Sequence, residues 1–499
     1  MIKKICFIFS ALFIIISSTQ AQGIQSLAEQ GLQKAYNMEL NAAEKIFNKM
    51  IDLKPEQPDG YFYIAKIHFW TYLATHDPGE YQVFLRFAEI AIEKIEKILK
   101  IDKKNVRILC MSGNVSSYQA MAFATNESSV DAFWASKRAV SNFEQVLELN
   151  PKYYDAYLGL GLFDYAMSFV PDFLKWAVNL TGLSSDKARG LRYIKTAYQK
   201  GTTSKTEAAF HLAKIYTDYL ADYDSSYLFS KSLIAKYPNN TLFRYVHAVS
   251  LIQDRQYEKA MESLNFIIRS DNTKFPQITA LANYRKGEIY FKRNQFARAV
   301  DFFDAFLEQS KELDLTGMAA YRIAISHKHL NNDTEYQKYL IQAKNGNQDI
   351  FEDSYAKRKS EYFVKNPIAD IDLKLIRFKN FVDNRRYKSA IDSVKILLSN
   401  ELNENQKAEA LTVISEASLN LKKYADAVTY AENILTSKTE NEKWVYPYSY
   451  LIQAKANYYV KEKEEALRLL EMAEDVNSHD FQDYIQSQIE NLKRKISRM

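Results

Sequence analysis

Residues 280–309 read ALANYRKGEIYFKRNQFARAVDFFDAFLEQ, and this stretch contains the spacing that decides the fold. It predicts two amphipathic helices, over residues 281–292 and 296–309, joined by a hinge at residues 293–295. Gly287 lies on the first helix, and Ala299 and Phe303 follow 12 and 16 positions later on the second. Because a small residue on each helix lets the two axes approach closely, an aromatic ring can fill the space beside them. The spacing therefore predicts a helical hairpin.

The hairpin resembles a tetratricopeptide repeat, whose pattern of Trp, Leu-Gly, Tyr, Ala, Phe and Pro extends over about 34 residues. Asn283 and Lys286 occupy the places of the Trp and the Leu, so the match is partial. The resemblance implies an all-α fold, a right-handed superhelix of stacked hairpins, and a role in protein association.

The same spacing recurs along the chain. Gly31, Ala43, Phe47 and Pro55 reproduce it in full near the N-terminus, where Pro55 ends the second helix because it lacks an amide hydrogen. Further pairs are Ala65/Ala91, Gly113/Ala139, Gly161/Gly190, Ala213/Ser226, Ala248/Ala260, Phe378/Ala390, Ser415/Ala427 and Ala454/Ala466. We expect about eleven hairpins, followed by a polar capping helix at residues 480–498, which the end of a solenoid requires.

The repeat is interrupted between Asn345 and Asp370, where Asn345-Gly346-Asn347 and Asn366-Pro367 both indicate turns. We therefore expect N-terminal repeats with long inserts at residues 22–205, central repeats at 206–345, an irregular linker at 346–369, and C-terminal repeats with the capping helix at 370–499. A single solenoid with a kink at the linker fits the sequence equally well.

The first 21 residues have the pattern of a secretory signal peptide. Lys3 and Lys4 precede an apolar stretch at residues 5–16, and Ala21 is the small residue that a signal peptidase would recognise. A membrane anchor is the competing interpretation, but about 12 apolar residues fall short of the ~20 that span a bilayer. We expect cleavage after Ala21 and export to the periplasm or cell envelope of a bacterium.

Net charge, cysteine count and hydrophobic content limit the partners and the kind of fold that we expect. Loss of Lys3 and Lys4 would lower the formal charge from +5 to +3, so nucleic acid is not the expected ligand. Only Cys110 would remain after cleavage, which rules out an intramolecular disulfide in the processed chain. With 47% hydrophobic residues and 13 Gly, the chain can bury a large core with few flexible joints.

Catalytic and cofactor motifs are missing from the sequence. His327 and His329 are two positions apart, which on a helix sends their side chains in different directions, and no HExxH spacing occurs. Neither a glycine-rich nucleotide loop nor a GxSxG elbow is present. We expect no metal site, no cofactor and no enzymatic activity.

Residues 162–188 form an unusually apolar insert that contains Phe169, Phe173 and Trp176. It could pack on the solenoid, cover a ligand as a lid, or make a peripheral membrane contact. Residues 171–191, with Pro171, Leu180-Thr181-Gly182 and Gly190-Leu191, resemble a segment of the eukaryotic inclusion-body-clearance family of tetratricopeptide proteins. Ser185 replaces the second Gly of that pattern, and the resemblance implies no catalytic residue.

The leading functional hypothesis is a scaffold that binds a protein or an extended peptide in the groove of the solenoid. The alternatives are a carbohydrate-handling or enzymatic protein on a solenoid frame and a membrane-associated assembly factor acting through the apolar insert. Tetratricopeptide domains that grip acidic C-termini resemble one another in presenting Lys and Asn on the groove face, and Tyr284 with Glu288 and Tyr245 with Val249 depart from that pattern.

The predicted binding residues share one position on successive first helices. Phe210, Tyr245, Tyr284 and Tyr321 each stand three residues before the small residue of a hairpin, and Lys292 and His329 lie two turns further along. We expect an aromatic ladder with a basic edge on the concave wall. The competing interpretation is that the rings only wedge neighbouring helices apart in the core.

Overall fold

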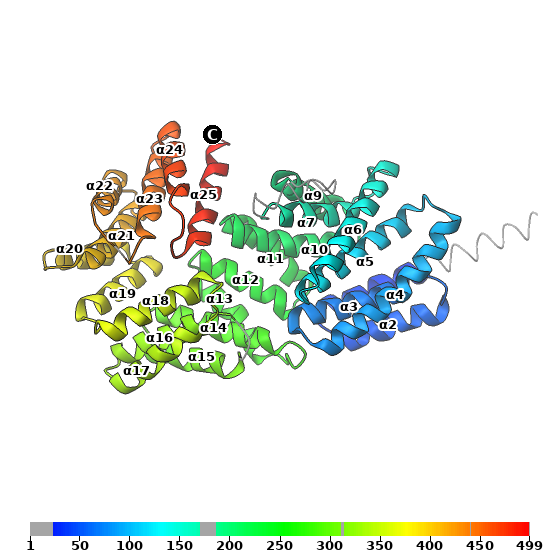
Figure 1. Ribbon diagram of the computed structural model, residues 1–499, viewed down its shortest axis with the longest axis horizontal. Helices are drawn as coiled ribbons and strands as arrows, with labels where there is room; N and C mark the ends of the chain where they lie inside the picture. Colours follow the sequence, from blue (N-terminus) through cyan, green and yellow to red (C-terminus); the bar gives the residue numbers. More distant parts are fainter. Residues whose placement is uncertain (1–22, 170–185, 311–313, 440, 499) are drawn as a thin grey trace, which may run out of the picture. The chain divides into compact units, whose positions relative to one another are not determined.

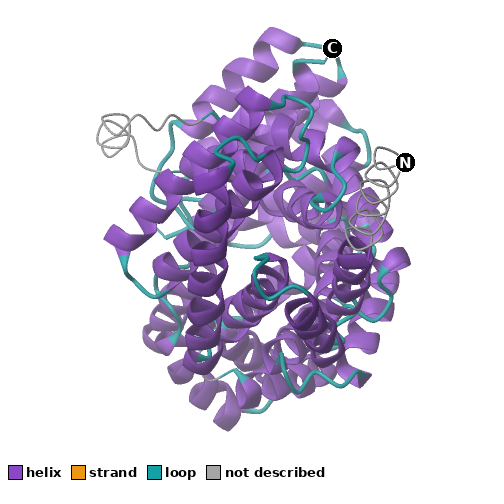
Figure 2. Ribbon diagram, turned by 90° about the vertical axis from the view of Figure 1, so that its right-hand side faces the viewer, coloured by secondary structure: helices purple, strands orange, loops and turns teal. Residues whose placement is uncertain are grey.

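The structure is a computed structural model of the 499-residue chain, and it describes residues 23–169, 186–310, 314–439 and 441–498. Within these ranges every long regular element is a helix (Figure 2). The predicted all-α repeat fold is confirmed. The predicted signal peptide lies outside the described residues. In the described part of the chain, no helix combines the length and the apolar character needed to cross a bilayer.

The chain forms two compact units, Met1–Leu212 with Ser232–Phe243, and Ala213–Lys231 with Arg244–Met499. The helices of the first unit are numbered along the chain in Figure 1. They are a helix over residues 23–36, Leu40–Leu53 (α2), Asp59–Thr75 (α3), Pro78–Ile101 (α4), Val106–Thr125 (α5), Ser129–Leu149 (α6), Ala156–Met167 (α7), Lys187–Lys200 (α9) and most of Lys205–Lys214 (α10).

The second unit continues the hairpins to the C-terminus. It begins with the π-helix Ile215–Tyr219 (η1), and the helices Tyr223–Lys236 (α11) and Thr241–Gln253 (α12) are divided between the units. The others are Tyr257–Arg269 (α13), Pro276–Lys292 (α14), Phe296–Gln309 (α15), Thr316–His329 (α16), Asp333–Gln342 (α17), the 3₁₀ turn Ala343–Asn345 (η2), Phe351–Lys365 (α18), Asp370–Asp383 (α19), Tyr387–Leu398 (α20), Glu404–Asn420 (α21), Tyr424–Leu435 (α22), Val445–Tyr459 (α23), Lys463–Glu474 (α24) and Gln482–Ile496 (α25).

The hairpins are held together by the close packing that their small residues predict. A Cβ added to Gly287 would lie 2.7 Å from the ring of Phe303, which is fully buried. At Gly161 and Gly190 a Cβ on either residue would lie within 2.9 Å of the carbonyl oxygen of the other. These glycines are required because the backbones themselves approach at this crossing. The predicted pairing of Gly161 with Gly190 is confirmed.

Serine replaces alanine at two of the crossings and adds a hydrogen bond. The Ser226 hydroxyl donates to the carbonyl of Ala213 over 2.8 Å, and the Ser415 hydroxyl donates to the carbonyl of Ala427 over 2.7 Å. Both serine residues are fully buried, so the bond satisfies a hydroxyl that would otherwise be costly to bury.

At many hairpin turns, a residue other than glycine adopts the left-handed backbone conformation. In the hinge at residues 293–295, Asn294 has φ of 58°, and the Gln295 amide donates back to the Tyr290 carbonyl over 2.9 Å. That bond satisfies a carbonyl at the end of the helix and reverses the chain. The same left-handed conformation occurs at Arg255, Asn331, Arg385, Lys422 and Lys461.

The predicted linker at residues 346–369 is wrong, because it contains the helix α18. Asn345-Gly346-Asn347 and Asn366-Pro367 lie at the two ends of this helix. The Asp353 carboxylate fixes the preceding turn by accepting from the amides of Met318 at 2.8 Å and Asn347 at 2.9 Å. Residues 244–499 form part of one compact unit, so this region is not a boundary between units.

The last helix, α25, packs against the start of the second unit. It buries Ile485, Ile489 and Ile496, so the predicted polar capping helix has one apolar face. Its Asn491 amide donates to the Leu220 carbonyl over 2.9 Å, next to η1. This contact joins residues 271 positions apart in the sequence. The second unit therefore turns back on itself.

Candidate functional site

The inner helices of the second unit are the candidate site. We give this name to α14, α16, α18, α19, α21, α23 and α25, which contact one another in addition to their hairpin partners. Contacts such as that of α14 with α19 connect hairpins far apart in the sequence.

Ion pairs in the second unit join the inner helices to residues that are distant in the sequence. Arg255, in the turn after α12, lies 2.5 Å from Glu416 of α21 and 3.7 Å from Asp383 of α19. Arg358 of α18 lies 2.6 Å from Asp480, which precedes α25. The inside of the second unit is therefore lined with charged groups as well as aromatic rings.

The predicted aromatic ladder is mostly buried. Tyr284 and Tyr321 are only 2% and 6% exposed, whereas Phe210 and Tyr245 are half-buried. The Tyr284 ring packs edge-on against Phe303 and Phe306 of the outer helix α15, with centroid distances of 5.5 and 5.1 Å. Phe210 belongs to the first unit. The rings of Tyr284 and Tyr321 thus fill the core, as the competing interpretation proposed.

The hydroxyl groups of two ladder tyrosines accept hydrogen bonds from arginine. Arg285 Nε donates to the Tyr245 hydroxyl over 3.3 Å, and Arg322 Nη1 donates to the Tyr284 hydroxyl over 3.3 Å. Each bond links one first helix to the next. Burial raises the pKa of Tyr284, so its hydroxyl stays protonated at neutral pH.

Three basic side chains surround a single carboxylate on α14 and α16. Glu288 lies 2.9 Å from Arg285 Nη1, 3.1 Å from Lys292 Nζ and 3.8 Å from Arg322 Nη2. The carboxylate is 8% exposed, and the three cations are 19%, 21% and 18% exposed. We call these four residues the Glu288 cluster.

The Glu288 cluster carries more positive than negative charge. Burial alone would raise the pKa of Glu288, but Lys292, Arg285 and Arg322 hold that pKa far below its usual range. Burial would lower the pKa of Lys292, and Glu288 instead raises it. All four groups are therefore ionised at neutral pH, and three positive charges face one negative charge.

His329 does not share this environment. Its ring stacks on Phe296, with centroids 3.9 Å apart, and its Nε2 is buried without a hydrogen-bond partner. Burial, helped by Arg377, lowers the pKa of His329 to about 4. The imidazole is therefore neutral at pH 7, and the predicted basic edge contains Lys292 but no charged histidine.

Sequence reasoning identified Lys292 but missed Arg285 and Arg322. Each follows a ladder tyrosine directly, in the dipeptides Tyr284-Arg285 and Tyr321-Arg322. A repeated Tyr-Arg pair was the available signal, because neighbouring residues on a helix point about 100° apart and one can face the core while the other faces the groove.

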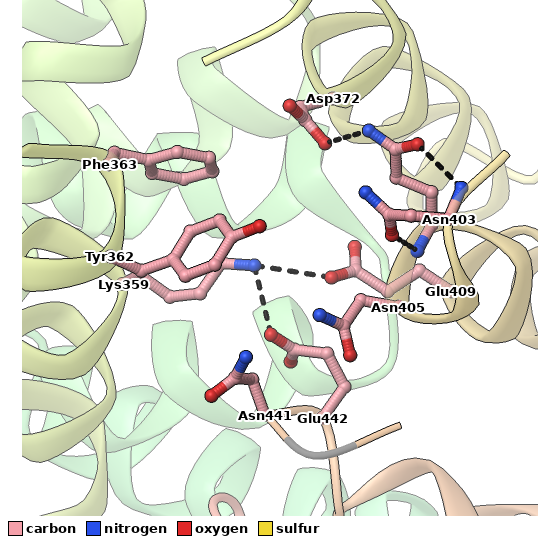
Figure 3. Close-up of a pocket in the computed structure, with 10 residues that line it drawn as sticks. Lys359, Tyr362, Phe363, Asp372, Asn403, Asn405, Glu409, Asn441 and Glu442 are labelled. Atoms are coloured by element: carbon pink, nitrogen blue, oxygen red, sulfur yellow. Dashed lines mark hydrogen bonds and ion pairs between the residues drawn. The ribbon is translucent and has the colours of Figure 1, made fainter. Parts of the chain in front are cut away.

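A polar pocket of about 290 Å³, counted with its open mouth, lies further along the inner helices (Figure 3). Lys359 points into it and lies 3.2 Å from Glu409 and 3.1 Å from Glu442. The pocket is lined by Lys359, Tyr362, Phe363, Asp372, Asn403, Asn405, Gln406, Glu409, Asn441 and Glu442.

The two carboxylates in the pocket differ in their surroundings. Burial raises the pKa of Glu409 despite Lys359. Burial would do the same for Glu442, but Lys359, Arg358 and a hydrogen bond from Trp444 lower its pKa to about 2. Glu442 is only 2% exposed and has all of these partners, so it is a structural anion.

Three other features bear on metal binding, thiol chemistry and membrane contact. Among the described residues, no group of three or more His, Cys, Asp or Glu side chains could hold a metal ion. Cys110 is buried, which raises the pKa of its thiol. Of the residues proposed for membrane contact, Phe169 is 48% exposed, whereas Phe173 and Trp176 lie outside the described residues.

The family model described as Iml2/Tetratricopeptide repeat protein 39 matches residues 154–402. This range contains residues 171–191, on which the local resemblance was based, together with the Glu288 cluster. No curated protein sequence matches the chain.

Several solved structures match most of the chain at low sequence identity. The P58(IPK) TPR domain has 14% identity and a TM-score of 0.23, with 95% of this chain and 99% of that chain covered. Yeast Tom70 has 13% identity and a TM-score of 0.22, with coverage of 95% and 97%. The Cut9–Hcn1 hetero-tetramer of APC/C has 14% identity and a TM-score of 0.26, with coverage of 96% and 97%.

Proposed function

Because this chain is a tetratricopeptide repeat protein that resembles the Iml2/Tetratricopeptide repeat protein 39 family over residues 154–402, we propose that it is a non-enzymatic scaffold. In this proposal the scaffold holds a protein or an extended peptide on the inner helices of its second unit. A protein-interaction role fits a tetratricopeptide scaffold. The position of the binding site and the cellular compartment are our own proposals.

The observation that carries the proposal is the Glu288 cluster. Buried charged side chains are usually paired, whereas these three partly buried cations share a single counter-ion. Such an arrangement costs free energy in the unbound protein, because desolvated cations lack full compensation. A partner that supplies negative charge or hydrogen-bond acceptors would recover that cost.

The charged groups of the pocket favour binding over catalysis. A pair of carboxylates with different pKa values is one requirement for acid–base catalysis. Here, however, both Glu409 and Glu442 are paired with Lys359, and Glu442 is further held by Arg358. A base occupied in this way is not free to accept a proton from a substrate, so we assign the pocket to partner contact.

We further propose that the protein works in the periplasm or cell envelope of a bacterium, after cleavage following Ala21. The support is the sequence pattern of the first 21 residues alone. Cleavage after Ala21 would retain every residue that the structure describes, since the described residues start at 23.

A peripheral membrane contact is a second candidate, favoured by the exposure of Phe169. The ring lies beside the Lys187 ammonium, 5.4 Å from its centroid, and an aromatic ring next to a cation suits the interface of an anionic membrane. Cosedimentation with vesicles of anionic and neutral lipid would test it. Equal recovery of wild type and Phe169→Ser from anionic vesicles would refute it.

Site-specific photocrosslinking tests the main proposal. The photoreactive residue p-benzoylphenylalanine would replace Tyr245, whose hydroxyl contacts the Glu288 cluster, or Ile341 of the outer helix α17, which is 59% exposed. In an envelope extract, we expect a discrete protein adduct from the Tyr245 position and none from Ile341. Adducts from Ile341 alone would place the binding surface on the outer helices and contradict the proposal.

A further inference from the structure

We propose that the Glu288 cluster is a carboxylate-binding site, and that the segment bound to the inner helices is an acidic peptide. This inference rests on the proposed scaffold function and adds the chemistry of the partner. Arg285, Lys292 and Arg322 together place three positive charges around Glu288, which leaves a surplus of two.

The geometry leaves donors available to a ligand. Lys292 Nζ has three hydrogens and pairs with one oxygen of Glu288. Arg322 lies 3.8 Å from the same oxygen, beyond hydrogen-bond distance. One of its N–H groups donates to the Tyr284 hydroxyl, and the guanidinium also lies near the Phe291 ring. Both side chains therefore have N–H groups that Glu288 does not use.

The partial exposure of the three cations suits a small planar anion. Each side chain is about one-fifth exposed, so a carboxylate arriving from solvent can meet its charged end. An arginine fork can bind a carboxylate through two parallel hydrogen bonds, and lysine adds a point charge beside it. A glutamate or aspartate side chain extending from a bound segment matches this requirement.

Other charges act on the cluster without cancelling the surplus. Asp383 attracts Lys292 but is already 3.7 Å from Arg255. Glu352 attracts Arg322 and is itself exposed to solvent, which weakens its field. Neither carboxylate makes a direct ion pair with the three cations.

The site differs from the Lys/Asn arrangement whose absence the sequence indicated. Its cations stand beside the ladder tyrosines, at positions 285 and 322, and at the end of α14. The basic groups of this site therefore come from helix positions that are not part of the Lys/Asn pattern.

Fluorescence anisotropy with a labelled peptide of eight glutamates tests the proposal in the full chain. A peptide of eight glutamines is the neutral control. We expect the glutamate peptide to bind and Lys292→Met to weaken it about tenfold, since one of two surplus charges is lost. Lys338→Met removes an equally positive side chain that is 60% exposed on α17, and it should leave the affinity unchanged.

A double variant separates charge from packing. Lys292→Met with Glu288→Gln restores the surplus of two positive charges, so the affinity should return to within about threefold of wild type. Glu288→Gln alone raises the surplus to three and should tighten binding. If Lys292→Met acted by disturbing the fold, removing a second charged group would not restore the affinity.

Several results would overturn the carboxylate site. One is that Lys338→Met and Lys292→Met weaken the affinity for the glutamate peptide equally, and another is that the double variant does not recover this affinity. The site would also be wrong if the glutamine peptide bound equally well, or if submillimolar inorganic phosphate displaced the glutamate peptide. If the peptide fails to bind while Tyr245 still crosslinks a protein, the scaffold function stands and the acidic partner is wrong. If the peptide binds as expected but no position crosslinks a protein, the scaffold function is wrong and the anion site stands.

Discussion

Gly287→Ala is a direct perturbation of the hairpin packing in the second unit. The new Cβ would lie 2.7, 2.8 and 2.9 Å from three atoms of the Phe303 ring. These distances are far inside van der Waals contact, and Phe303 is fully buried in the same cluster as Tyr284, so the ring cannot move into solvent.

Two opposing free-energy changes set the size of the effect. Alanine is favoured over glycine in a helix interior by roughly 1 kcal/mol. Overpacking a filled core typically costs about 1–3 kcal/mol, and the ring here meets the new methyl with three atoms. Contact with three ring atoms places the overpacking cost in the upper part of that range, at about 2–3 kcal/mol, so we expect a net loss of about 1–2 kcal/mol in the stability of the second unit.

Urea denaturation followed by circular dichroism measures this loss. The matched control is Gly23→Ala, where an added Cβ meets nothing within 4 Å. The double variant Gly287→Ala with Phe303→Leu should recover part of the stability, because the smaller side chain makes room for the methyl. An unfolding midpoint for Gly287→Ala at or above that of wild type would refute the packing described at this crossing.

Four further predictions concern the core, two titrating groups and the chain start. Ala299→Leu should destabilise the second unit by about 1–3 kcal/mol in thermal melts, since Ala299 is fully buried at the same crossing, and an unchanged melt would contradict its placement. His329 has a folded pKa of about 4, below its usual value. Wild type should therefore lose up to about 3 kcal/mol of stability as pH falls from about 6.5 to 4, and the His329→Phe variant should lose less over the same range. Glu442 has a folded pKa of about 2, so its contribution is present above about pH 4.5 and lost as pH falls toward 2. Glu442→Gln should therefore cost about 3–5 kcal/mol at pH 7 and much less at pH 2.5 in urea titrations. N-terminal sequencing of protein recovered from the envelope should begin at Gln22, and a retained Met1 would disprove export.

The repeat architecture was predictable because it depends on local spacing. The interval from Gly287 to Ala299 and Phe303 specifies two helices and their crossing without reference to distant residues. The turn residues were less predictable, since Arg255 and Lys422 adopt a left-handed conformation that their residue types do not indicate. The helix α18 was missed because its flanking Gly and Pro signals end helices on both sides of it.

The candidate site was only partly predictable for a different reason. The ladder position was found, but the helical period does not say how deeply a ring will be buried, and Tyr284 lies almost wholly inside the hairpin. The Glu288 cluster combines residues from α14 and α16, and the ion pairs of Arg255 join residues more than 120 positions apart. Such pairings depend on how tightly the hairpins turn about each other, which a single repeat does not specify.

A crystal structure of the full chain with the eight-glutamate peptide tests the central claim most directly, namely that the inner helices of the second unit are the binding surface. We predict a peptide carboxylate within about 3 Å of Lys292 Nζ and the Arg322 guanidinium, with the rest of the peptide lying along the inner helices. A peptide bound to the outer helices of that unit, with the Glu288 cluster empty, would contradict the account.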